Sequence, residues 1–156
     1  MVVLRCKVLL VGDVEVGKTA CLQMFHSNGK TFPKNYLSTN GVELTVKVVN
    51  IPDSETAVEM YVHDCSGSDL HRSLMPAVVQ LSTLPLTLSA AFFKFLFCFS
   101  LIELFVWLQW TGAAAVIVAY DMTNADSFRN CSKWVDMLME SFGQRKIKGT
   151  LLNIHL

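Results

Sequence analysis

An eight-residue glycine loop constrains the fold of this chain more than any other feature. Residues 12–19 read GDVEVGKT and match the pattern G-x-x-x-x-G-K-[ST]. In this pattern backbone N–H groups surround a phosphate, the lysine neutralises it, and the final hydroxyl binds Mg²⁺. An apolar run over residues 5–11 precedes the loop, and a helical pattern over residues 18–26 follows it. Strand, glycine turn and helix in this order predict the phosphate-binding loop of an α/β protein.

Length and charge narrow the class of protein further. A chain of 156 residues is long enough for one domain with its own core. Thirteen lysines and arginines balance thirteen acidic residues, so nucleic acid is not an expected partner. The five cysteines form no C-x-x-C pair and no histidine lies at metal-ligand spacing from them. Reduced thiols in the cytoplasm are therefore expected.

Strand and helix patterns alternate along the rest of the chain. Residues 43–49 and 58–63 predict an antiparallel hairpin, residues 113–120 a buried strand, and residues 149–152 the start of a fifth strand. Residues 127–142 predict an amphipathic helix capped by Asn124 or Asp126. The apolar face predicted for this helix comprises Phe128, Cys131, Val135, Leu138, Met139 and Phe142. The order of elements predicts a three-layer α/β fold with a mostly parallel sheet.

Three further segments give the chain a resemblance to a known family. Asp64 and Gly67 form a D-x-x-G motif at the end of the expected third strand, and residues 36–42 precede the second strand with Thr39 among them. Residues 120–124, followed by Ser127 and Trp134, complete the pattern. Together with the loop they resemble the Rab-like small GTPases, in particular the ciliary members that serve intraflagellar transport. The resemblance implies a P-loop small-GTPase fold, here lacking its last strand and helix.

The resemblance also implies a binding site for GTP or GDP with Mg²⁺. The metal would be held by Thr19, Thr39 and, through water, Asp64. Gly67 would offer its N–H to the γ-phosphate, Phe32 would lie against the guanine ring, and Tyr36 would cover the phosphates. The full set of expected nucleotide-binding residues is Gly12, Asp13, Val14, Glu15, Val16, Gly17, Lys18, Thr19, Ala20, Phe32, Tyr36, Thr39, Asp64 and Gly67.

Two departures from the family pattern bear on activity. Ser68 stands where most Rab proteins have a glutamine that orients the attacking water, and Val14 would crowd an arginine finger. Slow intrinsic hydrolysis is therefore expected, with no catalytic residue assigned. No N-K-x-D and no S-A-K follow the expected fifth strand, so guanine selectivity is implied by the resemblance alone.

An apolar segment at residues 81–109 interrupts the single domain expected over residues 1–156. Residues 86–107 have transmembrane length, but Lys94 and Glu103 nearly cancel the gain from insertion. A translated intron is the leading hypothesis, and a membrane-touching insertion stays open. No prenylation signal ends the sequence, so no lipid anchor is expected.

The resemblance implies a nucleotide-dependent switch subunit of the intraflagellar transport B complex, with intraflagellar transport protein 25 as partner, at the cilium and its base. Two other readings stay open. One is an interaction subunit, or a splice product, that no longer binds nucleotide. The other is an ATP-using P-loop enzyme, for which an acceptor site and a lid arginine are lacking.

Overall fold

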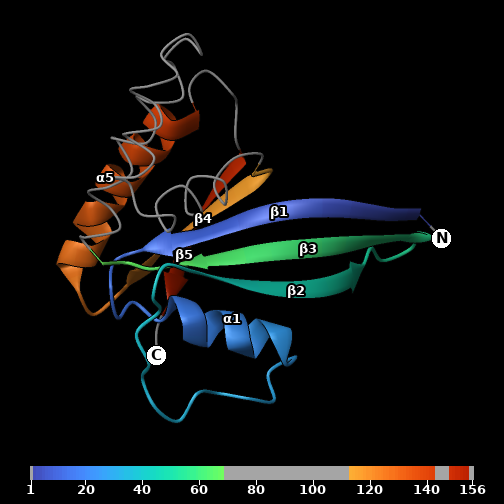
Figure 1. Ribbon diagram of the computed structural model, residues 1–156, viewed down its shortest axis with the longest axis horizontal. Helices are drawn as coiled ribbons and strands as arrows, with labels where there is room; N and C mark the ends of the chain where they lie inside the picture. Colours follow the sequence, from blue (N-terminus) through green and yellow to red (C-terminus); the bar gives the residue numbers. More distant parts are fainter. Residues whose placement is uncertain (1, 69–112, 143–147, 155–156) are drawn as a thin grey trace, which may run out of the picture.

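The computed structural model describes residues 2–68, 113–142 and 148–154, which form one five-stranded sheet with a helix on each face (Figure 1). The strands are β1 (Val2–Gly12), β2 (Val42–Asn50), β3 (Thr56–Cys65), β4 (Ala115–Asp121) and β5 (Lys148–Ile154). The helices are α1 (Lys18–His26) and α5 (Ala125–Phe142). The predicted α/β class and each predicted element within these ranges are confirmed. The apolar segment at residues 81–109, and with it the predicted interruption of the domain, lies outside the described residues.

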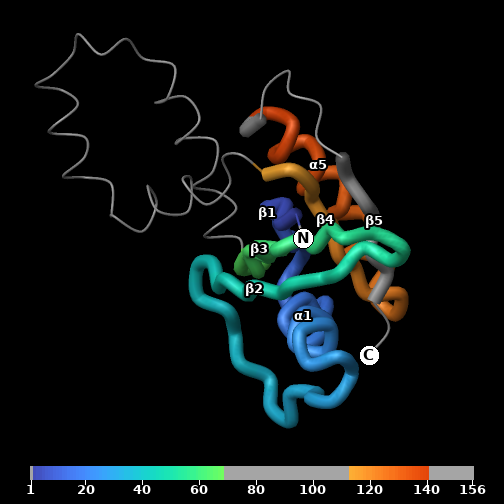
Figure 2. The backbone as a smooth tube through the Cα atoms, turned by 90° about the vertical axis from the view of Figure 1, so that its right-hand side faces the viewer, coloured from blue at the N-terminus to red at the C-terminus, as the bar shows by residue number. Residues whose placement is uncertain are grey.

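The sheet has the strand order β2-β3-β1-β4-β5. β2 and β3 form the predicted antiparallel hairpin, while β1 is parallel to both β3 and β4, and β4 is parallel to β5. Parallel strands end at the same edge, so the loops after β1, β3 and β4 meet there. Figure 2 shows α1 and α5 on opposite sides of the sheet. No helix in the described ranges is long and apolar enough to cross a membrane.

β1 is central because successive side chains fill two different cores. Leu9 and Val11 pack toward α5, in a cluster that includes Trp134. Val8 and Leu10 pack toward α1, in a cluster that includes Leu22. Side chains of a strand alternate between the faces of its sheet, so an unbroken apolar run suits a strand covered on both sides.

α5 buries a different face from the one that its apolar residues suggest. Its buried side chains are Ser127, Cys131, Trp134, Met137 and Leu138, whereas Phe128, Val135 and Met139 are exposed. The predicted face was therefore wrong in part, and Phe142 lies outside the described side chains. Of the two predicted caps, Asn124 is confirmed, because its side-chain oxygen accepts the backbone N–H of Asp126 at 3.0 Å, and the helix begins at Ala125, two residues before the predicted start.

Candidate functional site

The glycine loop lies between β1 and α1, at the edge where the parallel strands end (Figure 1). Gly12 ends β1 with φ of +146°, and a Cβ atom there would lie 2.2 Å from the Ala119 carbonyl oxygen of β4. Only glycine fits this close approach between two backbones. Gly17 is the N-cap of α1 and has a left-handed conformation. The loop thus wraps around the N-terminal end of α1, a position suited to anions.

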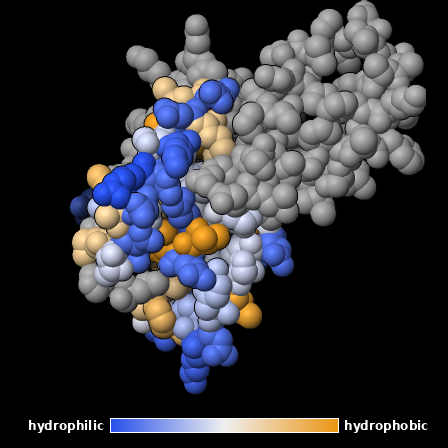
Figure 3. Space-filling view, turned by 90° about the vertical axis from the view of Figure 1, so that its left-hand side faces the viewer, coloured by the Kyte–Doolittle hydropathy of each residue, from blue (hydrophilic) through white to orange (hydrophobic). Residues whose placement is uncertain are grey.

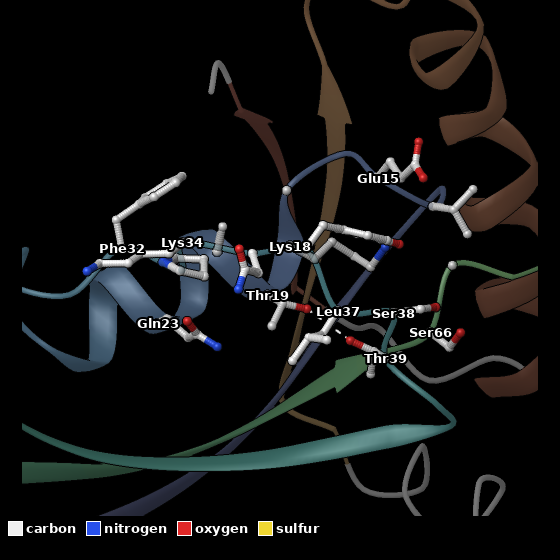
Figure 4. A pocket seen from close by; sticks show the side chains of 17 residues that line it. Glu15, Lys18, Thr19, Gln23, Phe32, Lys34, Leu37, Ser38, Thr39 and Ser66 are labelled. Carbon is white, nitrogen blue, oxygen red and sulfur yellow. Dashed lines mark hydrogen bonds between the residues drawn. The ribbon is translucent and has the colours of Figure 1, made fainter.

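A cavity of about 530 Å³ opens above this loop. Figure 4 shows Phe32 and Lys34 at one end of it, Ser66 at the other end, and Lys18, Thr19 and Thr39 between them. On the face seen in Figure 3, hydrophilic side chains surround a group of hydrophobic ones near its middle. The cavity combines apolar side chains, such as Phe32, with the charged and hydroxyl groups of Lys18 and Thr19, which suits a phosphorylated small molecule.

Most of the residues predicted from the sequence line this cavity. They are Val14, Glu15, Gly17, Lys18, Thr19, Ala20, Phe32, Tyr36, Thr39 and Gly67. Seven other lining residues were not predicted from the sequence, namely Gln23, Pro33, Lys34, Asn35, Leu37, Ser38 and Ser66. Gln23 lies one helical turn after Thr19, and residues 33–38 bridge two predicted site residues. Helical periodicity could have indicated Gln23, and chain continuity could have indicated residues 33–38.

Four predicted residues do not line the cavity. Gly12, the first residue of the loop, packs against the Ala119 backbone of β4, and Val16 is buried in the core on the α1 side. The Asp13 carboxylate is hydrogen-bonded to α5, so it does not face the cavity. Asp64 lies behind Thr19, whose hydroxyl donates to its Oδ2 at 2.5 Å. Any role of the first three residues at the site would therefore fall to their backbone atoms or their packing.

Lys18 is buried, although its ammonium carries a charge. Its Nζ donates to the carbonyl oxygens of Gly12 at 2.9 Å and Asp13 at 2.6 Å. Burial lowers the Lys18 pKa, while the charges of Asp64, Cys65 and Asp13 act to raise it. A bound phosphate would supply the negative charge that favours the ammonium form.

Three side-chain oxygens converge beside this lysine. The Thr19 hydroxyl lies 3.0 Å from the Thr39 hydroxyl and 2.5 Å from Asp64 Oδ2 (Figure 4 shows the first contact as a dashed line). Thr19 comes from α1, Thr39 from the loop before β2, and Asp64 from β3. Hydroxyl and carboxylate oxygens are the donors that Mg²⁺ prefers.

The Asp64 carboxylate is buried, which disfavours its charged form. It is 1% exposed, and its Oδ1 has no hydrogen-bond partner in the described part of the chain. Burial raises the Asp64 pKa, and the Thr19 hydrogen bond and the Lys18 charge only partly oppose that effect. A divalent cation near this oxygen would favour the carboxylate form, so these residues fit Mg²⁺. No cluster of three His, Cys, Asp or Glu side chains suited to a metal occurs in the described ranges.

The D-x-x-G glycine contacts the phosphate-binding loop itself. A Cβ atom on Gly67 would lie 2.4 Å from the carbonyl carbon of Asp13 and 2.5 Å from the nitrogen of Val14. A side chain cannot fit between these backbones, so glycine is required. The segment after β3 therefore packs directly on the loop after β1. Ser68 follows, with its backbone N–H 3.4 Å from the Ser66 hydroxyl oxygen.

Comparison with known proteins adds independent information. Residues 7–90 match the family model described as Roc, Ras of Complex, the Roc domain of DAPkinase. The chain is 32% identical over 152 residues to intraflagellar transport protein 27 homolog of Bos taurus, covering 97% of this chain and 65% of that protein. It is 36% identical over 138 residues to its namesake in Trypanosoma brucei brucei, covering 88% of this chain and 58% of that protein. It is also 29% identical over 128 residues to Ras-related protein Rab-7L1 of Rattus norvegicus, covering 82% of this chain and 46% of that protein. The chain spans less than two thirds of the length of each of these relatives.

Proposed function

The chain belongs to the Ras-like small GTPases described by the Roc family model, and from this premise we propose that it binds GTP and GDP with Mg²⁺ as a molecular switch. The relatives named for intraflagellar transport extend the proposal to a switch subunit of that transport machinery. Within it, the intraflagellar transport B complex and intraflagellar transport protein 25 are the proposed partners. The proposed location is the cytoplasm and the cilium with its base.

One observation carries the nucleotide-binding proposal. The buried Lys18 ammonium and the oxygens of Thr19, Thr39 and Asp64 lie together at the N-terminus of α1, beside a cavity of about 530 Å³. Phosphates need positive charge and N–H donors, while their metal needs hard oxygen ligands. The site offers both in neighbouring positions.

Each described residue has a defined part in this proposal. Lys18 pairs with the phosphates, and the backbone N–H groups that follow Gly12 surround them. Thr19 and Thr39 would supply hydroxyl oxygens to Mg²⁺, and Asp64 would hold it through water. The metal supplies positive charge that neutralises the phosphate oxygens when it is bound. Phe32 and Tyr36 are exposed at the rim of the cavity, where they can cover a ligand.

Hydrolysis by this chain is proposed to be slow. The hydroxyl of Ser68 lies 3.3 Å from the Ser66 hydroxyl, and its single-carbon side chain is too short to orient a water at the γ-phosphate. Val14 is half exposed at the cavity wall, where its branched side chain would obstruct an incoming arginine. Both features favour a protein that holds GTP over one that turns it over rapidly.

A second candidate function rests on the hydrogen bonds that the residues of the site make with one another. Lys18 donates to two carbonyl oxygens, and Thr19 donates to Asp64 and lies in hydrogen-bond contact with Thr39. Most of these polar groups pair with one another, apart from Asp64 Oδ1, so the site can persist as structure alone. The alternative is therefore an interaction subunit that binds no nucleotide.

Fluorescent N-methylanthraniloyl derivatives of GDP, GTP and ATP separate the two functions. The switch proposal predicts saturable binding of the guanine nucleotides, weaker binding of ATP, and loss of binding in a Lys18→Ala variant. Lys133→Ala is the matched control, because this lysine is exposed on α5. A folded wild-type chain that binds none of the three nucleotides would contradict the switch proposal and favour the interaction subunit.

A further inference from the structure

The Asp13 side chain is turned away from the cavity that its own loop surrounds. Its Oδ2 accepts a hydrogen bond from Asn130 Nδ2 at 2.7 Å, and its Oδ1 accepts one from Trp134 Nε1 at 2.8 Å. Both donors come from α5, more than a hundred residues along the chain. We call these three side chains, Asn130, Asp13 and Trp134, the α5 clasp. Hydrogen bonds to a carboxylate are stronger than those between neutral groups.

The donor side of the clasp is rigid. Asn130 and Trp134 are four residues apart, so they lie on the same face of α5. Trp134 is 1% exposed and packs in the same core cluster as Leu9 and Val11 of β1. A close-packed core holds its side chains in fixed rotamers. The Trp134 N–H donor is therefore fixed relative to the strand from which the phosphate-binding loop departs, and Asn130 lies partly exposed one helical turn before it.

The acceptor side of the clasp belongs to a residue that touches two parts of the site. The Asp13 carbonyl oxygen accepts a hydrogen bond from Lys18 Nζ at 2.6 Å. The Asp13 carbonyl carbon is also the nearest atom to a Cβ built on Gly67. A displacement of Asp13 would therefore move the partner of the phosphate-binding lysine and the surface on which the D-x-x-G segment rests.

Electrostatics explains why this carboxylate needs a clasp. A negative charge in a phosphate-binding loop opposes the binding of phosphate. Two N–H donors offset the charge of the Asp13 carboxylate and direct it toward α5. The loop then presents its backbone, and not this carboxylate, to the cavity.

We propose that Asp13 is a positioning residue, held by Asn130 and Trp134, that fixes the loop in the shape that retains nucleotide. The inference deepens the proposed function and rests on it. It assigns to α5, which does not line the cavity, control over the rate of nucleotide release.

A reversal of donor and acceptor tests the clasp in the full chain. Asn130→Asp places a second carboxylate against Asp13, whereas the double variant Asp13→Asn with Asn130→Asp restores one donor and one acceptor. The asparagine oxygen at position 13 still accepts the Trp134 N–H. The readout is the dissociation rate of N-methylanthraniloyl-GDP, chased with excess GDP in Mg²⁺. Asn130→Asp should speed release by about tenfold, and the double variant should return to within about threefold of the wild-type rate.

Three further variants separate positioning from stability. Asp136→Asn removes an exposed carboxylate of the same helix and should leave release unchanged. Leu138→Ala removes side-chain volume from the core cluster that contains Trp134 but keeps both hydrogen bonds to Asp13, so it should lower Tm without changing the release rate. If Asn130→Asp does not fold, Asn130→Ala removes one donor only and should speed release about threefold.

The outcomes distinguish the inference from the proposed function. Wild-type release rates in the Asn130 variants, or no rescue in the double variant, would overturn the clasp while nucleotide binding stands. Faster release in Leu138→Ala, in proportion to its loss of Tm, would reduce the clasp to ordinary packing. A wild-type chain that binds no nucleotide would overturn the proposed function and the clasp with it.

Discussion

Replacing Asp64 by asparagine should stabilise the nucleotide-free chain and weaken its response to Mg²⁺. The carboxylate is 1% exposed, and its Oδ1 has no hydrogen-bond partner among the described residues. An amide of the same shape keeps an oxygen for the Thr19 hydroxyl but carries no charge. A gain in stability together with a weaker response to Mg²⁺ is expected where a buried charge serves metal binding at the expense of stability.

The magnitudes follow from the burial of this carboxylate. A buried polar group without a partner costs about 1–3 kcal/mol, and more when it is charged. Loss of the attraction between Asp64 and the nearby Lys18 offsets part of the gain. A net increase of about 1 kcal/mol in the free energy of unfolding would raise Tm by about 2–4 °C. Loss of a residue that orients metal-bound water should weaken Mg²⁺-dependent nucleotide binding by about 10- to 100-fold.

The pH dependence provides a further check on the stability gain. Because burial raises the pKa of Asp64, the folded wild type holds a proton at pH values where the unfolded chain has released it. Wild-type stability therefore falls as pH rises through the folded pKa and stays lower above it. The asparagine variant lacks this titration. The gap in Tm should be largest above the folded pKa of Asp64 and shrink as pH falls below it.

The assay is thermal unfolding without nucleotide, combined with nucleotide titrations in Mg²⁺ and in EDTA. Glu55→Gln is the matched control, since this exposed carboxylate lies in the turn between β2 and β3 and does not act on the pKa of Asp64. This control should leave unchanged the ratio of the nucleotide dissociation constants measured in EDTA and in Mg²⁺. A lower Tm for the Asp64 variant at pH 7, or an unchanged Mg²⁺ response, would refute the reasoning.

Three other substitutions test separate parts of the site. Gly67→Ala would bring a Cβ within 2.4 Å of the Asp13 backbone, so it should cost about 1–3 kcal/mol in thermal unfolding and weaken nucleotide binding. Thr39→Ala removes the hydroxyl 3.0 Å from that of Thr19, and titrations should show about tenfold weaker GTP binding with a smaller effect on GDP. Ser68→Gln supplies an amide long enough to orient water, so it should raise single-turnover GTP hydrolysis by about tenfold or more. An unchanged rate would show that another feature limits hydrolysis.

Local patterns in the sequence were enough to predict the strands and helices that the structure describes. The apolar run of β1 predicted a strand buried on both faces, and its side chains do enter two cores. The bounds of α1 followed from Gly17 before it and Gly29 after it, where the Gly29 N–H bonds to the Met24 carbonyl at 2.8 Å. Such signals are local, so one sequence suffices to interpret them.

Other features depend on tertiary contacts and could not be predicted in this way. The buried face of α5 follows Trp134 and Leu138 because the helix must cover β1 and β4, and periodicity alone gave Phe128 undue weight. The direction of the Asp13 side chain depends on donors more than a hundred residues away. The motif identified this residue correctly as part of the loop but not the orientation of its carboxylate.

The central claim is that the phosphate and Mg²⁺ half of the site, formed by Lys18, Thr19, Thr39, Asp64 and Gly67, is sufficient to bind guanine nucleotide. Isothermal titration of unlabelled GDP into the nucleotide-free chain, in Mg²⁺ and again in EDTA, tests it most directly. The account predicts binding that is at least about tenfold tighter in Mg²⁺. Equal affinities in the two buffers, or no heat of binding to a folded chain, would contradict it.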